Sequence, residues 1–186
     1  IAKKLKNKNL PNLPLLRSLL EKKGIFSIDQ ALDLLIKKKN NSRIKIKELL
    51  FNDFYSWYYC DKNGDIRHKN GSFFQIKGIN ISIKTNNEEN SWEQPVINQR
   101  EVGYLGCITR EIKGVLYFLL QAKVEPGNIN SAQFSPTLQA TKSNFTQKHN
   151  GKLPVFYNEF SNLKNKLILN DQIHSEHGTR FFKKIN

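Results

Sequence analysis

The amino-acid sequence predicts an α+β fold, and three features of the chain support this prediction. Apolar residues recur with helical spacing between Leu13 and Lys39, and the pattern changes to the alternation of β-strands from Arg43 onward. A later helical stretch runs from Val155 to Leu169. Helices that flank a strand-rich middle are typical of α+β proteins. We therefore expect a helical N-terminal segment over residues 1–42 and a single domain over residues 43–186.

Two short helices are predicted between Leu13 and Lys39. The first carries a stripe of leucines that stops before Gly24, a residue type that commonly ends helices. The second begins at Ser27 and Gln30, whose spacing is that of a capping box. Its apolar stripe consists of Ile28, Ala31, Leu32, Leu35 and Ile36. We expect both helices to serve packing or subunit contact.

The middle of the chain predicts antiparallel strands joined by tight turns. An Asn63-Gly64 pair between two strand-like runs is a strong hairpin signal. Residues 74–83 alternate between apolar and polar, and Gly78 within them is a candidate bulge. The runs 103–110 and 115–124 are expected to form a further hairpin around residues 111–114.

The run 115–124 leads into the most informative part of the sequence. It places Gln121, Lys123 and Glu125 at alternate positions, so that an amide, an ammonium and a carboxylate share one face of a strand. Pro126-Gly127-Asn128 then ends the strand. The following residues, up to 144, are rich in Asn, Ser, Gln and Thr. This composition suits a polyhydroxylated ligand, and it equally suits a solvated loop.

Several blocks of this region resemble one enzyme family. In chain order they read HKNGSFFQIKG, WEQPVINQ, GYLG, QAKVEPGN, QFSPTLQATKSNF, KHNG and SEHG. This order resembles that of the NDP-hexose 2,3-dehydratases, enzymes of deoxysugar biosynthesis, from about Ile44 to the last residue. The resemblance implies a Nudix-like mixed β-sheet packed between helices. Members of that family usually carry two related copies in tandem, whereas no internal repeat is visible in this chain.

The resemblance also implies a reaction. Water would be eliminated across C2 and C3 of a nucleotide-linked 4-keto-6-deoxyhexose, giving a 3,4-diketo-2,6-dideoxy sugar after tautomerisation. The C3 proton is acidic because the C4 ketone can hold the resulting charge. The site then needs a base near C3, an acid near the C2 oxygen and hydrogen bonds to the C4 oxygen. No cofactor is needed.

Four residues are the candidates for catalysis. Glu125 is the first candidate for the base, with Glu176 as its rival. Lys123 polarises the C4 carbonyl or, alternatively, forms an ion pair with Glu125. His149 is expected to act as an acid or as a sugar contact, and the same two roles are open to His68 among the substrate-binding residues. A purely structural role is the alternative for each histidine.

Substrate binding is expected from polar residues of the same blocks. Thr141, Lys142, Ser143 and Asn144 are candidates for the diphosphate, which requires a cation and several donors. The family often has Arg at the position of Lys142, and lysine lacks its bidentate fork. Trp92 stacks on the nucleotide base or anchors a loop. Further contacts are expected from Gln94, Gln99, Gln121, Asn128 and Gln139.

No metal site is predicted. His174 and His177 are three residues apart, but no further ligand stands at a spacing known for zinc. The Arg100-Glu101-Val102-Gly103 segment lacks the paired acids with which Nudix hydrolases hold magnesium. Cys60 and Cys107 are expected to be free thiols, Cys107 as a buried small hydrophobe.

The net charge of +14 leaves a second class of function open. A basic nucleic-acid-binding module is the main alternative, because excess Lys and Arg attract phosphates. Its Lys-rich segments are not interleaved with an aromatic platform, and an AT-rich genome also enriches Lys, Asn and Ile. Nucleic acid is therefore an unlikely partner.

Three expectations concern the molecule as a whole. Neither a membrane span nor a signal peptide is visible, so the cytoplasm is the expected location. The chain begins without Met, so ends or a second repeat are expected to be missing. A third hypothesis for the function is therefore a non-catalytic, nucleotide-sugar-binding half of a longer enzyme. Because a single copy of a duplicated unit can recover its neighbour through a two-fold interface, we expect a homodimer.

Overall fold

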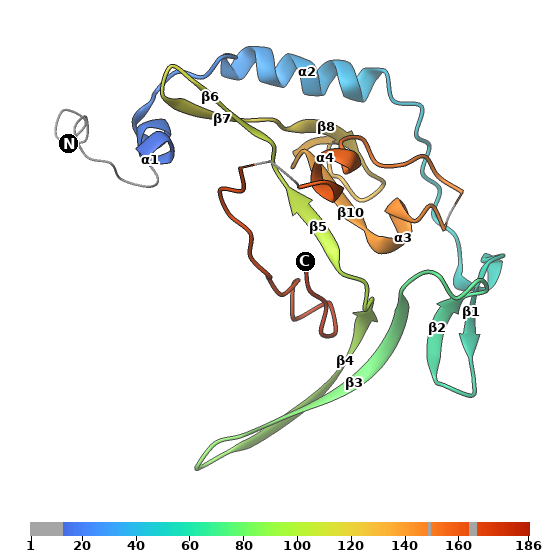
Figure 1. The fold of residues 1–186 in the computed structure, drawn as a ribbon. Coiled ribbons are helices and arrows are strands. Elements are labelled where there is room, and N and C mark those ends of the chain that lie inside the picture. The colour runs from blue at the N-terminus through green and yellow to red at the C-terminus, as the bar shows by residue number, and fades with distance from the viewer. Residues whose placement is uncertain (1–12, 149, 164–166) are drawn as a thin grey trace. The chain divides into compact units, whose positions relative to one another are not determined.

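The computed structural model describes residues 13–148, 150–163 and 167–186 (Figure 1). The chain divides into two units. The first unit consists of the described residues up to Ile46 and of Leu105–Gln139. The second consists of Lys47–Tyr104 and Ala140–Asn186. Each unit is therefore built from two separate stretches of sequence, and the domain boundary expected at residue 42 stays a prediction.

Two helices open the first unit where the sequence predicts them. Helix α1 spans Leu13–Leu20 and α2 spans Ile28–Asn40, with Gly24 in the link between them. The capping box at the start of α2 is confirmed, because Ser27 Oγ accepts from Gln30 N at 3.2 Å and Gln30 Oε1 accepts from Ser27 N at 2.9 Å. Helix α1 contacts strand β7 (Val115–Phe118), and α2 contacts β8 (Gln121–Val124) and β9 (Ala132–Ser135).

The strands of the first unit form short hairpins. Strand β6 (Thr109–Ile112) pairs with β7, and the turn between them places Lys113 and Gly114 at φ of 53° and 79°. Both values lie in the left-handed region that two-residue hairpin turns require, which explains the glycine. Strands β8 and β9 pair antiparallel, with Lys123 opposite Gln133.

The single strand predicted over 115–124 is interrupted at Leu119-Leu120, so that prediction is wrong in its extent. The reason is a change of partner, since β7 pairs with β6 and β8 pairs with β9. The buried Thr137 secures the break: its hydroxyl donates to Leu119 O and accepts from Ile108 N at 3.0 Å. The predicted strand 103–110 is likewise divided into β5 (Gly103–Gly106) and β6.

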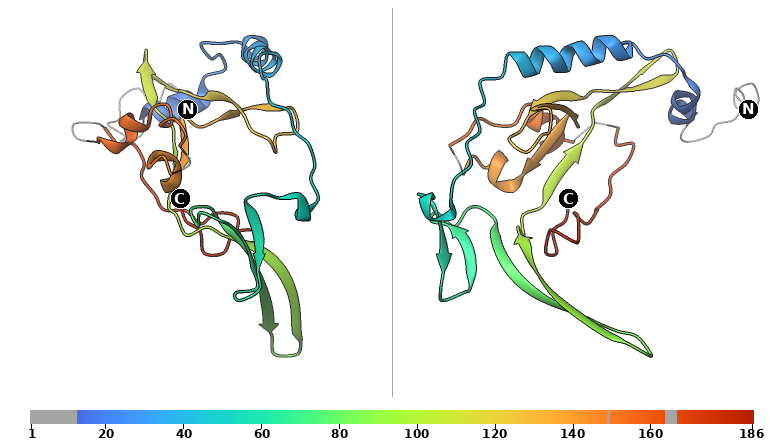
Figure 2. Two further views of the ribbon diagram at one scale, coloured as in Figure 1. Left: turned by 90° about the vertical axis from the view of Figure 1, so that its right-hand side faces the viewer. Right: turned by 180° about the vertical axis from the view of Figure 1, so that it is seen from behind.

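A four-stranded antiparallel sheet forms one part of the second unit. Its order is β1 (Trp57–Cys60), β2 (Asp65–His68), β3 (Gln75–Lys84) and β4 (Glu89–Asn98), and β3 and β4 run side by side as a long ribbon (Figure 2). The hairpin predicted at Asn63-Gly64 is confirmed, with Gly64 at φ 61°. The bulge predicted at Gly78 is wrong, because Gly78 pairs directly with Pro95 in an unbroken register.

The remainder of the second unit is mostly irregular. Strand β10 (Leu138–Thr141) pairs with β5, and each of the two strands has two residues in either unit. The short helices α3 (Lys142–Phe145) and α4 (Tyr157–Ser161) follow in the second unit. The helix predicted over 155–169 is thus reduced to five residues, because Phe156 takes a left-handed φ of 65° and the helix ends before Asn162. Residues 164–166 lie outside the described residues. Near the C-terminus, His174 and Asn186 exchange two backbone hydrogen bonds.

The buried apolar core of the described residues is small. It comprises Ala132 and Leu138 in the first unit and Val96 and Ala140 in the second. Helices and mainly antiparallel sheets make up the elements, and the Nudix-like arrangement stays a prediction. No helix within the described ranges is long and apolar enough to cross a membrane.

Candidate functional site

Two residues of the predicted face, Lys123 and Glu125, line a hollow in the first unit. The hollow has a volume of about 360 Å³. Its polar wall is formed by Lys123, Glu125, Asn128, Gln133, Ser135 and Gln139, and its apolar wall by Leu105, Phe134 and Pro136. Four residues predicted from the sequence therefore lie together here: Lys123, Glu125, Asn128 and Gln139.

Lys123 connects the charged groups of this hollow. Its Nζ lies 2.7 Å from Glu125 Oε1 and donates to Gln139 Oε1 at 3.4 Å. The contact arises from the strand, because alternate residues at the end of β8 point to one side. Gln121 does not line the hollow, and its side-chain amide donates to Thr137 O. The ion pair left open as an alternative for Lys123 and Glu125 is thus present.

The turn after β8 fixes the position of Asn128. Its backbone N–H donates to Glu125 O at 3.1 Å, and its side-chain amide donates to Ser131 O at 3.2 Å. These bonds close the turn that Pro126-Gly127 begins, with Ser131 at φ 64°. The carbonyl oxygen of the Asn128 side chain has no hydrogen bond to another described residue. Asn128 therefore offers the hollow an acceptor on a rigid support.

The exposure of the ion pair bears on its role. The side chains of Lys123 and Glu125 are 34% and 41% exposed. A pair so accessible to water contributes about 0–1 kcal/mol to stability. Within the described residues, Glu125 Oε2 has no hydrogen-bond partner. The pair is thus a weak structural element that keeps one carboxylate oxygen open to a ligand.

The residues expected to bind the diphosphate lie in the second unit, where Thr141 is the N-cap of α3 and the other three belong to the helix. Ser143 is 3% exposed, and both its N–H and its hydroxyl donate to Glu101 Oε2, at 3.1 and 2.7 Å. Asn144 Oδ1 accepts from the backbone and the hydroxyl of Thr141, at 3.0 and 2.7 Å. Lys142 is exposed. A carboxylate occupies the donors of Ser143, and phosphate binding by this segment stays a prediction.

Glu176, the rival base, belongs to a cluster in the second unit. Its Oε2 accepts from Asn186 Nδ2 at 2.7 Å, and this bond lowers the pKa of Glu176 more than burial raises it. A second bond, from His177 N to Oε1 at 3.2 Å, acts in the same direction. A carboxylate with a lowered pKa is a weaker base. Glu125, by contrast, lines a hollow, and the choice between the two candidate bases stays a prediction.

Lys184 forms the buried centre of the same cluster. It is 5% exposed, and its Nζ donates to Glu101 O at 3.1 Å. Burial lowers the pKa of Lys184, against the opposing effect of the charges of Glu176 and Glu101. Neither Lys184 nor Glu101 was predicted as a site residue, because their contacts join residues 83 positions apart in the sequence.

Three of the remaining predicted residues, His68, Trp92 and Gln94, have partners of their own. His68 Nδ1 lies 2.8 Å from Asn70 Oδ1, and its ring packs on Phe73 with centroids 4.3 Å apart. Trp92 Nε1 donates to Gln94 Oε1 at 3.0 Å, and Gln94 Nε2 donates to Thr179 O at 2.8 Å. Gln99 is half-buried after β4. His149 lies outside the described residues.

The described residues also bear on the predictions for metal binding and for the two cysteines. Within the described ranges, no three His, Cys, Asp or Glu side chains gather closely enough to hold a metal ion. Both cysteines are free, as expected. The prediction that Cys107 is buried is wrong, because it is exposed in the link between β5 and β6.

Comparison with known proteins identifies related enzymes. A family model described as NDP-hexose 2,3-dehydratase matches residues 29–186. A dTDP-4-dehydro-6-deoxy-α-D-glucopyranose 2,3-dehydratase of Saccharopolyspora spinosa is 42% identical over 137 residues, which are 73% of this chain and 28% of that protein. Its namesakes of Amycolatopsis orientalis and Streptomyces violaceoruber are each 38% identical over 145 residues, covering 76% and 77% of this chain and 31% and 32% of theirs.

The extent of these matches decides what they show. The chain spans about a third or less of the length of these curated relatives. The family model, by contrast, covers the chain from within α2 to the last residue. This chain belongs to the NDP-hexose 2,3-dehydratase family.

Proposed function

We propose that this chain provides the catalytic site of a sugar nucleotide 2,3-dehydratase, a hydro-lyase. Its substrate is a nucleotide-linked 4-keto-6-deoxyhexose, and the names of the relatives favour the dTDP-linked glucose derivative. The observation that carries the proposal is the hollow in which Glu125, Lys123, Asn128 and Gln139 converge. These are the groups that an elimination next to a ketone requires: a base, a cation and neutral hydrogen-bonding partners.

Glu125 is the base of the proposed reaction. Its open Oε2 takes the proton from C3, and the electrons of the C3–H bond pass into the enolate whose charge is held on the C4 oxygen. Lys123, held at 2.7 Å from Glu125, is close enough to stabilise that developing charge once the substrate lies in the hollow. A positioned base contributes about 10²- to 10⁴-fold in rate.

Loss of the C2 hydroxyl completes the elimination. The C2–O bond breaks, the hydroxyl takes up a proton and leaves as water, and a double bond forms between C2 and C3. The resulting enol at C3 tautomerises to the 3,4-diketo-2,6-dideoxy sugar. Atoms and electrons balance without an oxidant, a reductant or a cofactor.

Incubation of the 186-residue chain with dTDP-4-keto-6-deoxyglucose tests the proposal directly. NMR should show loss of the C3 proton signal and appearance of a C2 methylene. Deuterium at C3 should slow the reaction if proton removal limits the rate. A chain that binds dTDP but leaves this sugar unchanged would favour the second candidate below.

The second candidate is a nucleotide-sugar-binding part of a longer enzyme without catalysis of its own. The observation that favours it is that this chain covers only 28% to 32% of the length of the curated relatives. A basic nucleic-acid-binding module remains the alternative from another class, and tight binding of oligonucleotides without binding of dTDP would favour it. Cytoplasmic location stays a prediction.

We further propose that the chain forms a homodimer. The buried core is small, while α1 and α2 expose large apolar side chains, among them Leu19 at 76% and Ile28 at 79%. Burial of such side chains is the main driving force of association. Light scattering should give twice the monomer mass at micromolar concentration, and a monomer throughout this range would contradict the proposal.

A further inference from the structure

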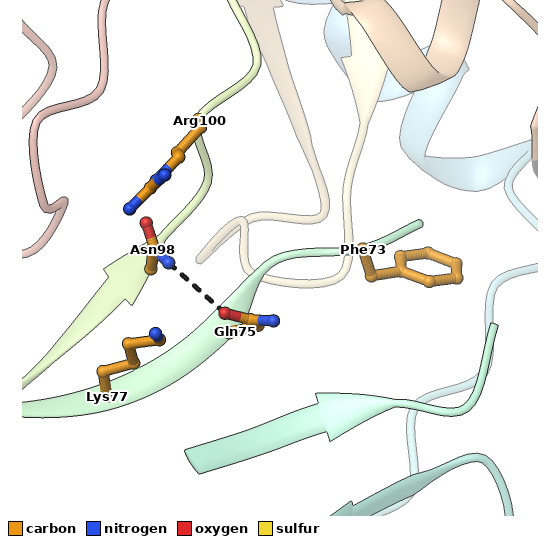
Figure 3. A pocket seen from close by; sticks show the side chains of 5 residues that line it. All are labelled: Phe73, Gln75, Lys77, Asn98 and Arg100. Atoms are coloured by element: carbon orange, nitrogen blue, oxygen red, sulfur yellow. Dashed lines mark hydrogen bonds between the residues drawn. The ribbon is translucent and has the colours of Figure 1, made fainter. Parts of the chain in front are cut away.

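A second hollow lies in the second unit, where β3 begins and β4 ends (Figure 3). Its volume is about 370 Å³, and it is lined by Phe73, Gln75, Lys77, Asn98 and Arg100. The paired strands hold Gln75 directly opposite Asn98. The floor of the hollow is thus part of a hydrogen-bonded ladder, and its side chains are well positioned.

The lining of this hollow is positively charged. Lys77 and Arg100 contribute two cations, and no lining residue is acidic. Arg100 has no carboxylate within salt-bridge distance among the described residues. The Nζ of Lys77 lies 3.9 Å from Asp65 Oδ2. That same oxygen already lies 2.5 Å from Arg67 Nη2. Two cations with weak or absent partners favour an anionic ligand.

The amide of Asn98 adds a second requirement. Its Nδ2 donates to Gln75 Oε1 at 3.3 Å, whereas its buried Oδ1 has no hydrogen-bond partner within the described part of the chain. Figure 3 shows this oxygen turned toward the side of Arg100. A buried acceptor is costly unless a donor reaches it. A ligand that fits this hollow therefore carries a hydroxyl or an N–H beside its negative charge.

The ring of Phe73 has a different role. It points away from the four polar side chains (Figure 3) and packs on His68 and Trp57, with centroids 4.3 and 5.8 Å away. This packing secures the start of β3, next to Gln75. His68, predicted as a substrate contact, thus lies behind the hollow and supports its wall.

We propose that this hollow binds the phosphates of a nucleoside diphosphate group, with Lys77 and Arg100 on the phosphate oxygens. A hydroxyl or N–H of the same ligand donates to Asn98 Oδ1. The identity of the ligand rests on the proposed function; the anionic site itself rests on the charge and geometry of the hollow. Ser143, by contrast, already gives its donors to Glu101.

Calorimetric titration of the 186-residue chain with dTDP tests the site. Arg100→Gln and Lys77→Gln should each weaken dTDP binding about ten- to a hundredfold, the range for loss of a hydrogen bond to a charged group. Lys84→Gln is the matched control, since Lys84 lies on the same strand and pairs with Glu89 at 3.5 Å outside the hollow. Its dissociation constant should stay within about twofold, as expected of an exposed pair.

Circular dichroism shows whether the variants fold. If Lys77→Gln disturbs the fold through its contact with Asp65, Arg100→Gln still tests the site, because Arg100 has no such ion pair among the described residues. The site is wrong if both variants fold and bind dTDP as the control does, even when turnover is present. It is also wrong if the wild type ignores dTDP up to millimolar concentration, or binds only oligonucleotides. If binding is lost in both variants but the wild type shows no turnover, the site stands and the dehydratase function fails.

Discussion

Glu125 and Lys123 form an ion pair whose weakness as a structural contact makes it informative about function. Glu125→Gln keeps the size of the side chain and removes its basicity. The affinity for dTDP should therefore survive, while turnover of dTDP-4-keto-6-deoxyglucose should fall about 10²- to 10⁴-fold. Steady-state rates followed by NMR, together with the dissociation constant of dTDP, measure the two effects separately.

Glu111→Gln is the control, because Glu111 is an exposed acid of the same unit on β6. Its turnover should match that of the wild type. Lys123→Met should also slow the reaction if Lys123 stabilises the C4 oxygen. A folded Glu125→Gln variant with more than about a tenth of wild-type turnover would remove Glu125 as the base, given the expected range, and Glu176→Gln would be tested next.

Asp65 predicts a specific response to acid. Its side chain is fully buried, and the hydrogen bond from Arg67 lowers the pKa of Asp65 below the ordinary 3.8, with the charges of Arg67 and Lys77 adding to the effect and burial opposing it. A lowered pKa stabilises the folded state above the unfolded value and loses this contribution as the pH falls through the folded value. Thermal midpoints should therefore drop below about pH 4, near that ordinary value.

Asp65→Asn removes this titration, so its midpoint should be lower at neutral pH and should change less on acidification. Asp171→Asn provides the control, because Asp171 is exposed in the same unit. It should retain the acid response of the wild type. Equal acid dependence in Asp65→Asn and the wild type would show that another group governs the transition.

For single residues, the sequence predicts those contacts that depend on neighbours along the chain. The common face of Lys123 and Glu125 follows from the two-residue period of a strand. The carboxylate of Glu101 on Ser143 joins residues 42 positions apart, and the pairing of Gln75 with Asn98 joins residues 23 positions apart. Such contacts depend on the fold as a whole, which explains why the sequence did not predict that Gln75, Lys77 and Asn98 gather with Arg100 around one hollow.

Helix α2 depends on its N-terminal cap. Ser27→Ala removes the oxygen that accepts from Gln30 N, leaving one of the first backbone donors of the helix without its partner. The free energy of unfolding in urea should decrease by about 1 kcal/mol, within the usual range of 0.5–2 kcal/mol for such caps. Because α2 contacts β8 and β9, the loss should appear in the whole first unit.

Ser91→Ala is a suitable control for the cap, since Ser91 is exposed on β4 and its hydroxyl bonds no other described residue. Gln30→Ala should cost part of the same free energy, because it removes the reciprocal bond to Ser27 N. If Ser27→Ala is as stable as Ser91→Ala, the N-terminal turn of α2 contributes nothing to the stability of the unit.

Elements were predicted well where one local signal defines them. The cap of α2 and the Asn63-Gly64 turn are of this kind. The division of 115–124 into β7 and β8 was not predicted, because no local signal marks the break at Leu119-Leu120, which is secured by bonds to Thr137 from a later segment. The shortness of α4 likewise depends on the left-handed Phe156, a conformation for which phenylalanine gives no local signal.

For the whole molecule, salt distinguishes the two classes of phosphate ligand. A diphosphate presents few charges, so the logarithm of its binding constant should fall with the logarithm of salt concentration with a slope shallower than about −2. A bound oligonucleotide would give a steeper slope, because each neutralised phosphate adds about 0.7 for single strands. Titrations of dTDP and of a single strand at several salt concentrations measure both slopes. Tight, steeply salt-dependent binding of the oligonucleotide at physiological salt, together with no binding of dTDP, would contradict the proposed dehydratase function.

The division of each unit into two stretches of sequence has a consequence for how the protein is made. A ribosome releases the N-terminus first, so the first unit has all its residues once Gln139 has emerged. The sheet of the second unit emerges earlier, yet Ile97 receives its backbone partners Arg180 and Phe182 only after residues 180–182 have been synthesised. At ordinary elongation rates this delay lasts on the order of seconds. During that time the end of β4 is an unpaired edge, and a chaperone that binds nascent strands would find its target there.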